Sequence, residues 1–330
     1  MHLVVLAGGI GGARFLLGVR ALARRRAATG TPTEVTAIVN IGDDITLHGL
    51  RVCPDLDSVM YTLGGAADPE RGWGRVGETW VVRDELTAYA AESAWFGLGD
   101  RDLATHLVRT RMLDAGQPLS AVTEALCHRW QPGVRLLPAS DDRVETHVLV
   151  ESATGGEELL HFQEWWVREH AHRRARRFVF VGADSAKPAA GVLATLATAD
   201  VVLLAPSNPV VSIAPILAVP GLREALVEGP ASVLGVSPII GGAPVRGMAD
   251  RCLDAVGVAC TAAGVGALYG ARAAGGLLDG WLVDTVDAGT EVGGVAVRSV
   301  PLWMSDEAAT MEMVEAALRL AVPREGGPGE

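Results

Sequence analysis

The chain has 330 residues, of which 49% are hydrophobic, and a formal net charge of −11 at pH 7. This length allows one large α/β domain or two smaller ones with a substantial core. The acidic balance disfavours sequence-independent nucleic-acid binding, and the chain lacks the run of about 18 apolar residues that would span a bilayer. Its four cysteines show no metal-binding spacing, so we expect reduced thiols in a cytoplasmic protein. Only the tail at 325–330 is expected to be disordered.

The chain begins with a pattern typical of a strand, a glycine turn and a helix. The apolar run Leu3–Leu6 comes first, and helical periodicity extends over Ala13–Arg26. Four glycines lie between them: Gly8, Gly9, Gly11 and Gly12. Backbone N–H groups at a helix N-terminus attract anions, so this run predicts a phosphate-binding loop, with Arg14 as a candidate partner. A structural turn is the alternative, because no P-loop lysine follows and the third glycine of a dinucleotide-binding motif is missing.

Acidic residues follow the second predicted strand, Thr33–Asn40. They are Asp43, Asp44, Asp55 and Asp57. In a parallel sheet, ligands bind at the carboxyl ends of the strands, so the glycine run and these aspartates should face one crevice. Grouped carboxylates repel one another unless a cation compensates them, and we therefore expect a Mg²⁺ site that uses one or two of the four. Asp55 is also predicted to cap a short helix over Asp57–Leu63.

Residues 66–174 are predicted to form an inserted lobe of helices and strands. Helical periodicity covers Asp84–Glu92, Asp102–Leu113 and Leu119–Trp130, with Asp100 as the expected cap of the second helix. In that helix, four apolar residues are expected to face inward: Leu103, Leu107, Val108 and Met112.

A hairpin is predicted from Val144–Val150 and Glu158–Phe162, which flank a turn at Thr154-Gly155-Gly156. Phe162, Trp165 and Trp166 follow as the core of the lobe or, alternatively, as a wall for a flat ring.

Alternation of strands and helices resumes at Phe178–Gly182. Further strands are expected at Val201–Ala205, Ala231–Val236, Trp281–Val283 and Val295–Val300, and helices at Ala190–Thr198, from about Met248, and at Asp306–Ala321. Two strands end in turns of small polar residues, which contain Ser207, Asn208, Ser237 and Gly241. The predicted fold is a Rossmann-like, doubly wound, mainly parallel α/β sheet with an inserted lobe, in which 1–65 and 175–330 form the core.

Seven ordered segments carry a resemblance to a known family. They read GGIGGARFLLG, VNIGDD, CPDLDSVMYTLGG, GLGDRDLATH, HFQEWWVR, LLAPSNPVVSI and SPIIGGAPVRGMAD. In this order they resemble the 2-phospho-L-lactate transferase family of coenzyme F420 biosynthesis, and within it the actinobacterial phosphoenolpyruvate transferase branch. The resemblance implies a Rossmann-like dimer that transfers enolpyruvyl phosphate from a guanosine diphosphate-linked donor to the deazaflavin alcohol Fo, giving dehydro-F420-0 and GMP. It also implies that Asp57 contacts Fo and that Asp44 belongs to the metal-binding region.

The implied reaction assigns roles to the candidate residues. Mg²⁺ held by Asp44 and Asp57, with Asp43 or Asp55 behind them, would bridge the diphosphate; alternatively, one aspartate accepts the hydroxyl proton. We assign the donor diphosphate to the loop Gly8–Gly12, and the guanosine to the turns that contain Ser207, Asn208, Ser237 and Gly241. The ring of Fo would lie toward the lobe, near Trp165 and Trp166.

Three alternatives accompany this interpretation. The same transfer with a lactyl donor would give F420-0. A non-catalytic nucleotide-sugar-binding regulator would share the glycine opening and the aspartates. A nicotinamide oxidoreductase requires an acidic residue at the end of the second strand, where the chain has Asn40.

Overall fold

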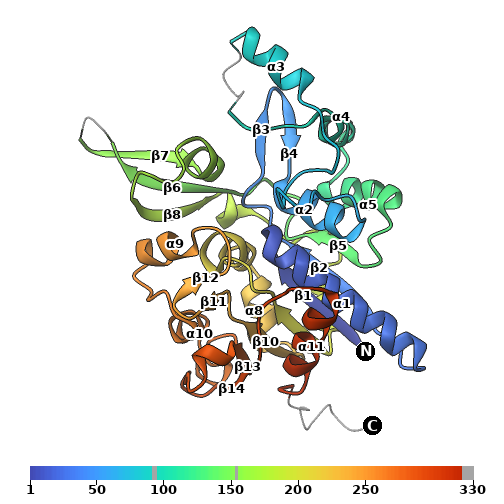
Figure 1. Ribbon diagram of the computed structural model, residues 1–330, viewed down its shortest axis with the longest axis vertical. Coiled ribbons are helices and arrows are strands. Elements are labelled where there is room, and N and C mark those ends of the chain that lie inside the picture. The colour runs from blue at the N-terminus through green and yellow to red at the C-terminus, as the bar shows by residue number, and fades with distance from the viewer. Residues whose placement is uncertain (91–94, 153–154, 322–330) are drawn as a thin grey trace.

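The computed structural model describes residues 1–90, 95–152 and 155–321, and its centre is a seven-stranded sheet (Figure 1). Every pair of neighbouring strands in this sheet is parallel. In spatial order the strands are β14 (Ala296–Ser299), β13 (Gly280–Val283), β10 (Ser232–Val236), β9 (Val201–Leu204), β1 (His2–Ala7), β2 (Glu34–Val39) and β5 (Arg135–Pro138). The predicted Rossmann-like α/β fold is confirmed.

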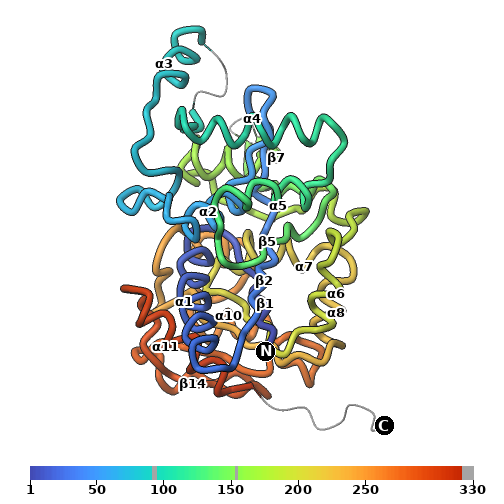
Figure 2. Tube along the Cα trace, turned by 90° about the vertical axis from the view of Figure 1, so that its right-hand side faces the viewer, coloured from blue at the N-terminus to red at the C-terminus, as the bar shows by residue number. Residues whose placement is uncertain are grey.

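Helices cover both faces of this sheet (Figure 2). The helices α1 (Gly9–Ala28) and α11 (Glu307–Leu318) lie on one side of β1 and β2, and α6 (Val192–Ala197) and α8 (Leu222–Glu228) lie on the other. Close approach of α1 to α11 depends on Gly18, since a Cβ atom there would lie 2.5 Å from the Thr310 side chain. The remaining helices of this region are α7 (Ala214–Leu217), α9 (Ala249–Ala255) and α10 (Ala262–Tyr269).

The order of the strands reverses between β1 and β9. From β1 the chain proceeds outward through β2 to β5, and from β9 it proceeds the other way through β10 and β13 to β14. Loops at the carboxyl ends of β1 and β9 therefore diverge, and such a switch point is where open α/β sheets bind ligands. The glycine run after β1 and the Ser207-Asn208 turn after β9 both lie at this point.

A three-stranded antiparallel sheet lies beside the main sheet. It consists of β7 (Glu157–His161), β6 (Glu145–Glu151) and β8 (Ala175–Val181). The predicted hairpin is thus confirmed as β6 and β7, although Thr154 of its turn lies outside the described residues. The strand expected at Phe178–Gly182 is β8. We expect this strand to belong to the main sheet, but it pairs with β6 in the small sheet.

A hairpin of β3 (Ile45–Leu47) and β4 (Leu50–Val52) precedes the lobe, and β4 packs on the lobe helix α4 (Asp100–Asp114). The neighbouring helices are α2 (Pro54–Leu63), α3 (Val81–Ala88) and α5 (Leu119–Trp130). Strand β5 lies within the range expected for the lobe, yet it pairs with β2 at the edge of the main sheet. Two predicted features lie outside the described residues: Glu92, which is the expected end of the helix that starts at Asp84, and the tail at 325–330.

Both predicted helix caps are wrong. Helix α2 begins at Pro54, which places Asp55 inside its first turn, because proline is favoured at the first helical position. Helix α4 begins at Asp100 itself. The Asp100 carboxylate instead accepts from the backbone N–H groups of Val81 and Val82, each at 3.0 Å, and so caps α3.

The predicted inward face of α4 is wrong for two of its four residues. Leu103 and Met112 are partly buried, and Leu103 packs against a small apolar cluster. Leu107 is 57% exposed and Val108 39% exposed, whereas Thr105, His106 and Arg109 are buried. The helix thus buries a polar stripe because other elements supply partners for it.

Two further features complete the fold. A short hairpin of β11 (Ile239–Ile240) and β12 (Ala243–Pro244) follows β10, and α9 begins where a helix was expected after Met248.

None of the described helices alone has the length and apolar composition needed to cross a membrane. Among the described residues, one pair of helical segments, Pro209–Leu217 and Leu222–Glu228, meets these criteria of length and composition when the two are taken together, and the pair is bent by 86°.

Candidate active site

The glycine run forms the first turn of α1. The predicted separate turn is wrong, because the helix begins at Gly9 with Gly8 as its cap residue. A Cβ atom on Gly8 would lie 2.6 Å from Asp55 Oδ2, and one on Gly12 would lie 2.8 Å from Ser207 Oγ. The glycines therefore let Asp55 and Ser207 approach the helix N-terminus closely.

Asn40 joins two of the four aspartates at this N-terminus. Its side-chain nitrogen donates to Asp43 Oδ1 at 3.2 Å and to Asp55 Oδ2 at 2.9 Å. Its oxygen accepts from the Gly42 N–H at 2.8 Å, which fixes the orientation of the amide group. Both carboxylates are buried, and neither forms an ion pair within the described part of the chain. Asp43 and Asp55 are therefore adjacent negative groups without a cationic partner.

Burial shifts the acidity of this pair. The pKa of Asp55 is raised to about 7 by burial, although hydrogen bonds from Asn40 and from the backbone of Gly9 oppose the shift. The pKa of Asp43 is raised well above its ordinary value by burial, and Asp55 raises it further. A bound cation would remove this penalty, because it stabilises the charged form of both carboxyl groups.

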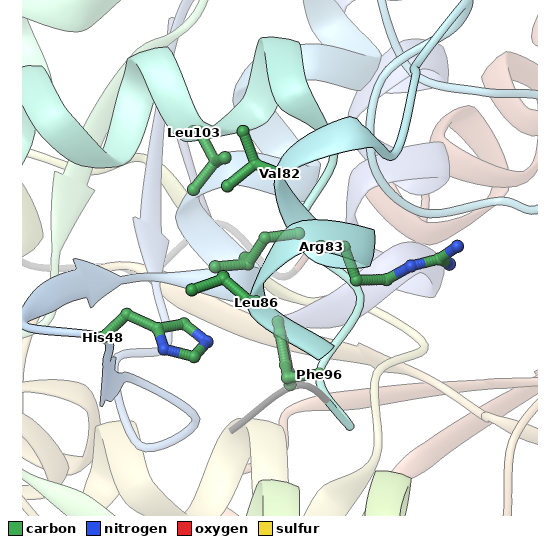
Figure 3. A pocket seen from close by; sticks show the side chains of 7 residues that line it. His48, Val82, Arg83, Leu86, Phe96 and Leu103 are labelled. Carbon is green, nitrogen blue, oxygen red and sulfur yellow. The ribbon is translucent and has the colours of Figure 1, made fainter. Parts of the chain in front are cut away.

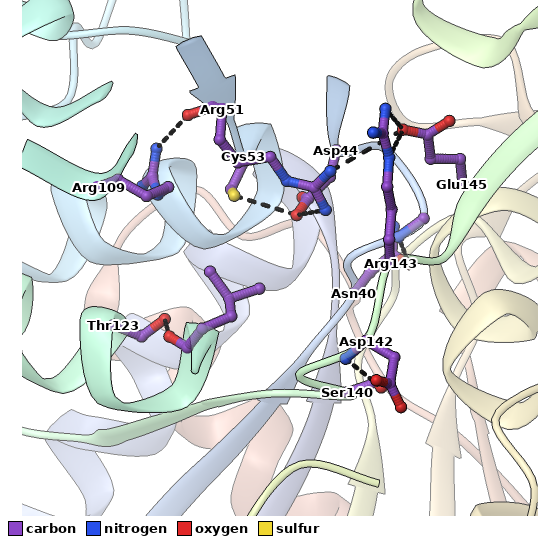
Figure 4. Close-up of polar contacts among 12 residues, drawn as sticks. Asn40, Asp44, Arg51, Cys53, Arg109, Thr123, Ser140, Asp142, Arg143 and Glu145 are labelled. Atoms are coloured by element: carbon purple, nitrogen blue, oxygen red, sulfur yellow. Dashed lines mark hydrogen bonds and ion pairs between the residues drawn. The ribbon is translucent and has the colours of Figure 1, made fainter. Parts of the chain in front are cut away.

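Asp44 belongs to a different cluster, which Figure 4 shows. Arg51 from β4 donates to Asp44 Oδ2 at 3.0 Å, and the Cys53 thiol donates to the same oxygen at 3.0 Å. Burial raises the pKa of Asp44 to about 6, and the charge of Arg51 limits the shift. Burial also raises the pKa of Cys53, so this thiol keeps its proton and remains a donor. The second oxygen of Asp44 has no partner among the described residues.

Asp57 is held by a second arginine. Arg109 from α4 donates to Asp57 Oδ1, and both side chains are buried. Burial raises the pKa of Asp57, while Arg109 and His106 oppose the shift. Asp57 Oδ2 is buried, lies 3.7 Å from His106 Nδ1 and forms no hydrogen bond within the described part of the chain. Asp57 therefore combines an oxygen fixed by Arg109 with a buried oxygen that lacks a hydrogen bond.

The four aspartates thus separate into an uncompensated pair and two arginine-bound carboxylates. No group of three or more His, Cys, Asp or Glu side chains within residues 1–90, 95–152 and 155–321 is arranged to hold a metal ion. Any metal at this site would need ligands beyond protein side chains, such as water and phosphate oxygens.

The end of β7 and the residues just after it contact the segment that carries Asp43 and Asp44. The His161 ring nitrogen Nε2 lies 3.0 Å from the backbone oxygen of Asp44, and Gln163 donates to Asp43 Oδ2 at 3.4 Å. Burial lowers the pKa of His161, which favours the neutral ring. The lobe therefore orders the segment that carries Asp43 and Asp44.

The other candidate residues have mostly structural contacts. Ser207 Oγ accepts from the Gly8 N–H at 3.2 Å and donates to the Gly8 oxygen at 2.8 Å. The Asn208 oxygen accepts from Val210 N–H at 3.0 Å and so caps the turn after β9. Ser237 is bonded to Ile239 within its own turn.

Two candidates are accessible. Arg14 is exposed on the second turn of α1 and forms no ion pair with a described residue. Gly241 has a φ of +57° and donates its N–H to Asp287 at 3.0 Å. Of the residues proposed for the donor, Arg14 is the one with a charge available for an anion.

The aromatic cluster forms part of the lobe core. Trp165 is fully buried and donates from Nε1 to the Arg173 oxygen at 2.7 Å, whereas Trp166 is only partly buried. The apolar pocket in Figure 3, lined by His48, Leu86 and other side chains, measures about 10 Å³. This volume suits about one water molecule, so a tricyclic ring does not fit there.

Sequence reasoning missed the partners of the aspartates. Asn40 enters the sequence analysis only as a residue that does not suit a ribose, and His106 enters the sequence reasoning only as a possible proton carrier. Arg51 and Arg109 do not enter it. The spacing of Asp102, His106 and Arg109 places them on one face of a helix, and this was the available signal.

Comparisons with known proteins show the family of the chain. A family model described as 2-phospho-L-lactate transferase CofD matches residues 3–302. The chain is 61% identical to a Nocardia farcinica protein named phosphoenolpyruvate transferase, covering 97% of this chain and 95% of that protein. It is 60% identical to a protein of the same name from Thermobifida fusca, with 98% of each chain covered.

A solved structure supports the fold alone. It is a Bacillus halodurans protein of the UPF0052 family, which is 19% identical and aligns with a TM-score of 0.59. The alignment covers 96% of this chain and 99% of that protein. The family match over most of the chain and the high identity to curated relatives agree. The chain therefore belongs to the 2-phospho-L-lactate transferase CofD family, and it is a transferase.

Proposed function

We propose that this chain is a phosphoenolpyruvate transferase of coenzyme F420 biosynthesis. It would transfer an enolpyruvyl phosphate from enolpyruvyl-diphospho-5'-guanosine to the terminal hydroxyl of Fo, giving dehydro-F420-0 and GMP. The names of its relatives support this choice of donor. The observation that carries the proposal is the uncompensated pair, Asp43 and Asp55, at the N-terminus of α1 and at the switch point of the sheet.

The residues present fit a Mg²⁺ ion. Asp43 and Asp55 are buried, accept from the same Asn40 nitrogen and lack a cationic partner in the described part of the chain. Asp44 and Asp57, by contrast, are already neutralised by Arg51 and Arg109. We therefore assign Mg²⁺ to Asp43 and Asp55, with Asp44 and Asp57 as its neighbours. Bound there with water and phosphate oxygens, the ion would neutralise charge on the donor diphosphate.

Asp57 is the residue that we assign to the Fo hydroxyl. Its Oδ2 atom forms no hydrogen bond with the described residues and has His106 Nδ1 at 3.7 Å, whereas Oδ1 is held by Arg109. A free carboxylate oxygen can accept the hydroxyl hydrogen bond and orient the nucleophile for attack at phosphorus. The bond from the hydroxyl oxygen to phosphorus forms, the bond from phosphorus to the GMP oxygen breaks, and the hydroxyl proton passes to Asp57 or to solvent.

Binding of the donor follows from the groups around α1. The helix N-terminus presents backbone N–H groups, and Arg14 adds a free positive charge, so we assign the diphosphate to this end of the helix. Guanosine would lie against the turns after β9 and β10, which contain Ser207 and Gly241. We also propose, from the resemblance of the chain to its family, a cytoplasmic homodimer.

A coupled assay tests the function. The purified chain is mixed with Fo, Mg²⁺ and a donor made in place from GTP and either phosphoenolpyruvate or 2-phospho-L-lactate by a guanylyltransferase. We expect the mass of dehydro-F420-0 with phosphoenolpyruvate. Formation of F420-0 from phospholactate alone would reverse the donor, and absence of both products would refute the proposed transfer.

A further inference from the structure

Helix α4 buries a row of polar side chains between its apolar contacts. Thr105, His106 and Arg109 are buried, whereas Leu107 is 57% exposed. Burial of polar and charged groups costs free energy unless every group finds a partner. Replacing a buried ion pair by apolar residues is often neutral or stabilising. Stability alone therefore gives no reason for this buried polar row.

The buried stripe forms a chain of contacts that ends at Asp57. Arg109 donates to Asp57 Oδ1, and a second guanidinium nitrogen lies 3.0 Å from His106 Nδ1. The same nitrogen donates to the backbone oxygen of Arg51 at 3.3 Å. Arg51 in turn holds Asp44. One guanidinium thus connects the segments that carry Asp57 and Asp44.

These contacts define the state of His106. Arginine N–H groups can only donate, so His106 Nδ1 must accept, and the ring proton lies on Nε2. Nε2 is 3.3 Å from Asp102 Oδ2, and Asp102 Oδ1 accepts from the Tyr61 hydroxyl at 2.6 Å. Tyr61 lies one turn after Asp57 on α2. The contacts therefore lead from α2 through α4 and back to α2.

We propose that His106 and Arg109 are positioning residues for Asp57. His106 orients the Arg109 guanidinium, and Arg109 fixes Asp57 Oδ1. Oδ2, which is buried 3.7 Å from His106 Nδ1 and lacks a hydrogen bond among the described residues, is the oxygen that receives the Fo hydroxyl when Fo binds. Neither residue touches the substrate. This inference rests on the proposed function, because it needs Asp57 to act on that hydroxyl.

The experiment compares two substitutions of His106 in the transfer assay. His106→Asn keeps an acceptor near the place of Nδ1, while His106→Leu removes it. We expect His106→Leu to lower kcat roughly 10- to 100-fold, with an unchanged KM for the guanosine donor, because the positioning of Asp57 and not donor binding is lost. His106→Asn should recover kcat to within a few-fold of the parent chain. Leu107→Ala, on the exposed face of the same helix, is the matched control and should have no effect.

Two results would overturn the inference. One is a folded His106→Leu chain with the kcat of the parent chain. The other is a folded His106→Asn chain that is as impaired as His106→Leu. If His106→Leu does not fold, Arg109→Lys replaces it, because lysine keeps the charge beside Asp57 but lacks the planar fork. A kcat of Arg109→Lys equal to that of the parent chain would then contradict the inference, and a loss of kcat at constant donor KM would support it.

The two proposals can fail separately. If the parent chain forms no product with either donor, the proposed function fails, and the inference fails with it. If the parent chain turns over and the His106 variants match it, only the inference is wrong.

Discussion

The side-chain nitrogen of Asn40 lies 2.9 Å from Asp55 Oδ2, where the second strand of the sheet ends. In a nicotinamide enzyme this position would hold an acidic residue for a ribose. Here an amide occupies it and draws two carboxylates together, because the same nitrogen also donates to Asp43. The site is thus organised for a cation and a phosphate.

Asp55→Asn should stabilise the protein in buffer without divalent cations. The native pKa of Asp55 is about 7 and lies above its ordinary value of 3.8, so stability falls as the pH rises from about 4 to about 7. Removal of the charge should raise the free energy of unfolding by about 2–4 kcal/mol near pH 8 and by less near pH 5. Urea unfolding at both pH values measures this difference. A destabilised Asp55→Asn chain near pH 8 would show that Asp55 has a cationic partner.

Asp57→Asn should lower stability, although burial raises the pKa of Asp57 as well. The loss of the carboxylate leaves the buried Arg109 charge unpaired, which costs about 3–5 kcal/mol and outweighs the relief from burial of the Asp57 charge. The same unfolding experiment provides the comparison, and the transfer assay should show little turnover. Equal stability of the Asp55→Asn and Asp57→Asn chains would contradict the separation of the four aspartates into two kinds.

Mg²⁺ should bind more tightly as the pH rises. Deprotonation of Asp55, whose pKa is about 7, and of Asp43, whose pKa is also raised, must precede coordination. Binding near pH 6 should therefore release protons, and the affinity should level off above about pH 8. Calorimetry in two buffers with different ionisation enthalpies counts the released protons. If Mg²⁺ binds near pH 6 without releasing protons, the cation does not bind at Asp43 and Asp55.

Gly8→Ala should damage the site directly. The added Cβ atom would lie 2.6 Å from Asp55 Oδ2 and 2.7 Å from Ser212 Cβ, so the carboxylate must move. We expect a loss of about 1–3 kcal/mol in unfolding free energy, together with weaker Mg²⁺ binding. Gly293→Ala is the control, because nothing lies within 4 Å of its added Cβ atom. A Gly8→Ala chain that binds Mg²⁺ as the parent chain does would contradict the tight approach of Asp55.

The sequence predicted the main sheet because the alternation of strands and helices is a local signal. The glycine run and Asp55 lie against each other, as parallel strands with their carboxyl ends on one edge lead one to expect. Strand β8 shows the limit of this reasoning: its residues form a strand, but the choice of β6 as a partner depends on tertiary structure. Likewise, α2 begins at Pro54, so the proline marks the start of the helix and Asp55 does not cap it.

The partners of the aspartates were harder to predict. An apolar stripe normally marks the buried face of a helix, and in α4 this rule selected Leu107 and Val108, which are exposed. Arg109 is buried only because Asp57 of another helix accepts from it. A pairing between distant segments leaves no periodic signal in one sequence. The spacing of Asp102, His106 and Arg109 indicates a shared face, but the pairing of Arg109 with Asp57 required the structure.

The position of the cation can be measured in a crystal. Crystals of the chain grown with Mn²⁺ in place of Mg²⁺ and with a guanosine nucleotide would give an anomalous signal at the metal. We expect one strong peak within coordination distance of Asp43 and Asp55, beside the N-terminus of α1. A peak at Asp44 and Asp57 alone, or no peak at all near these four residues, would contradict this position.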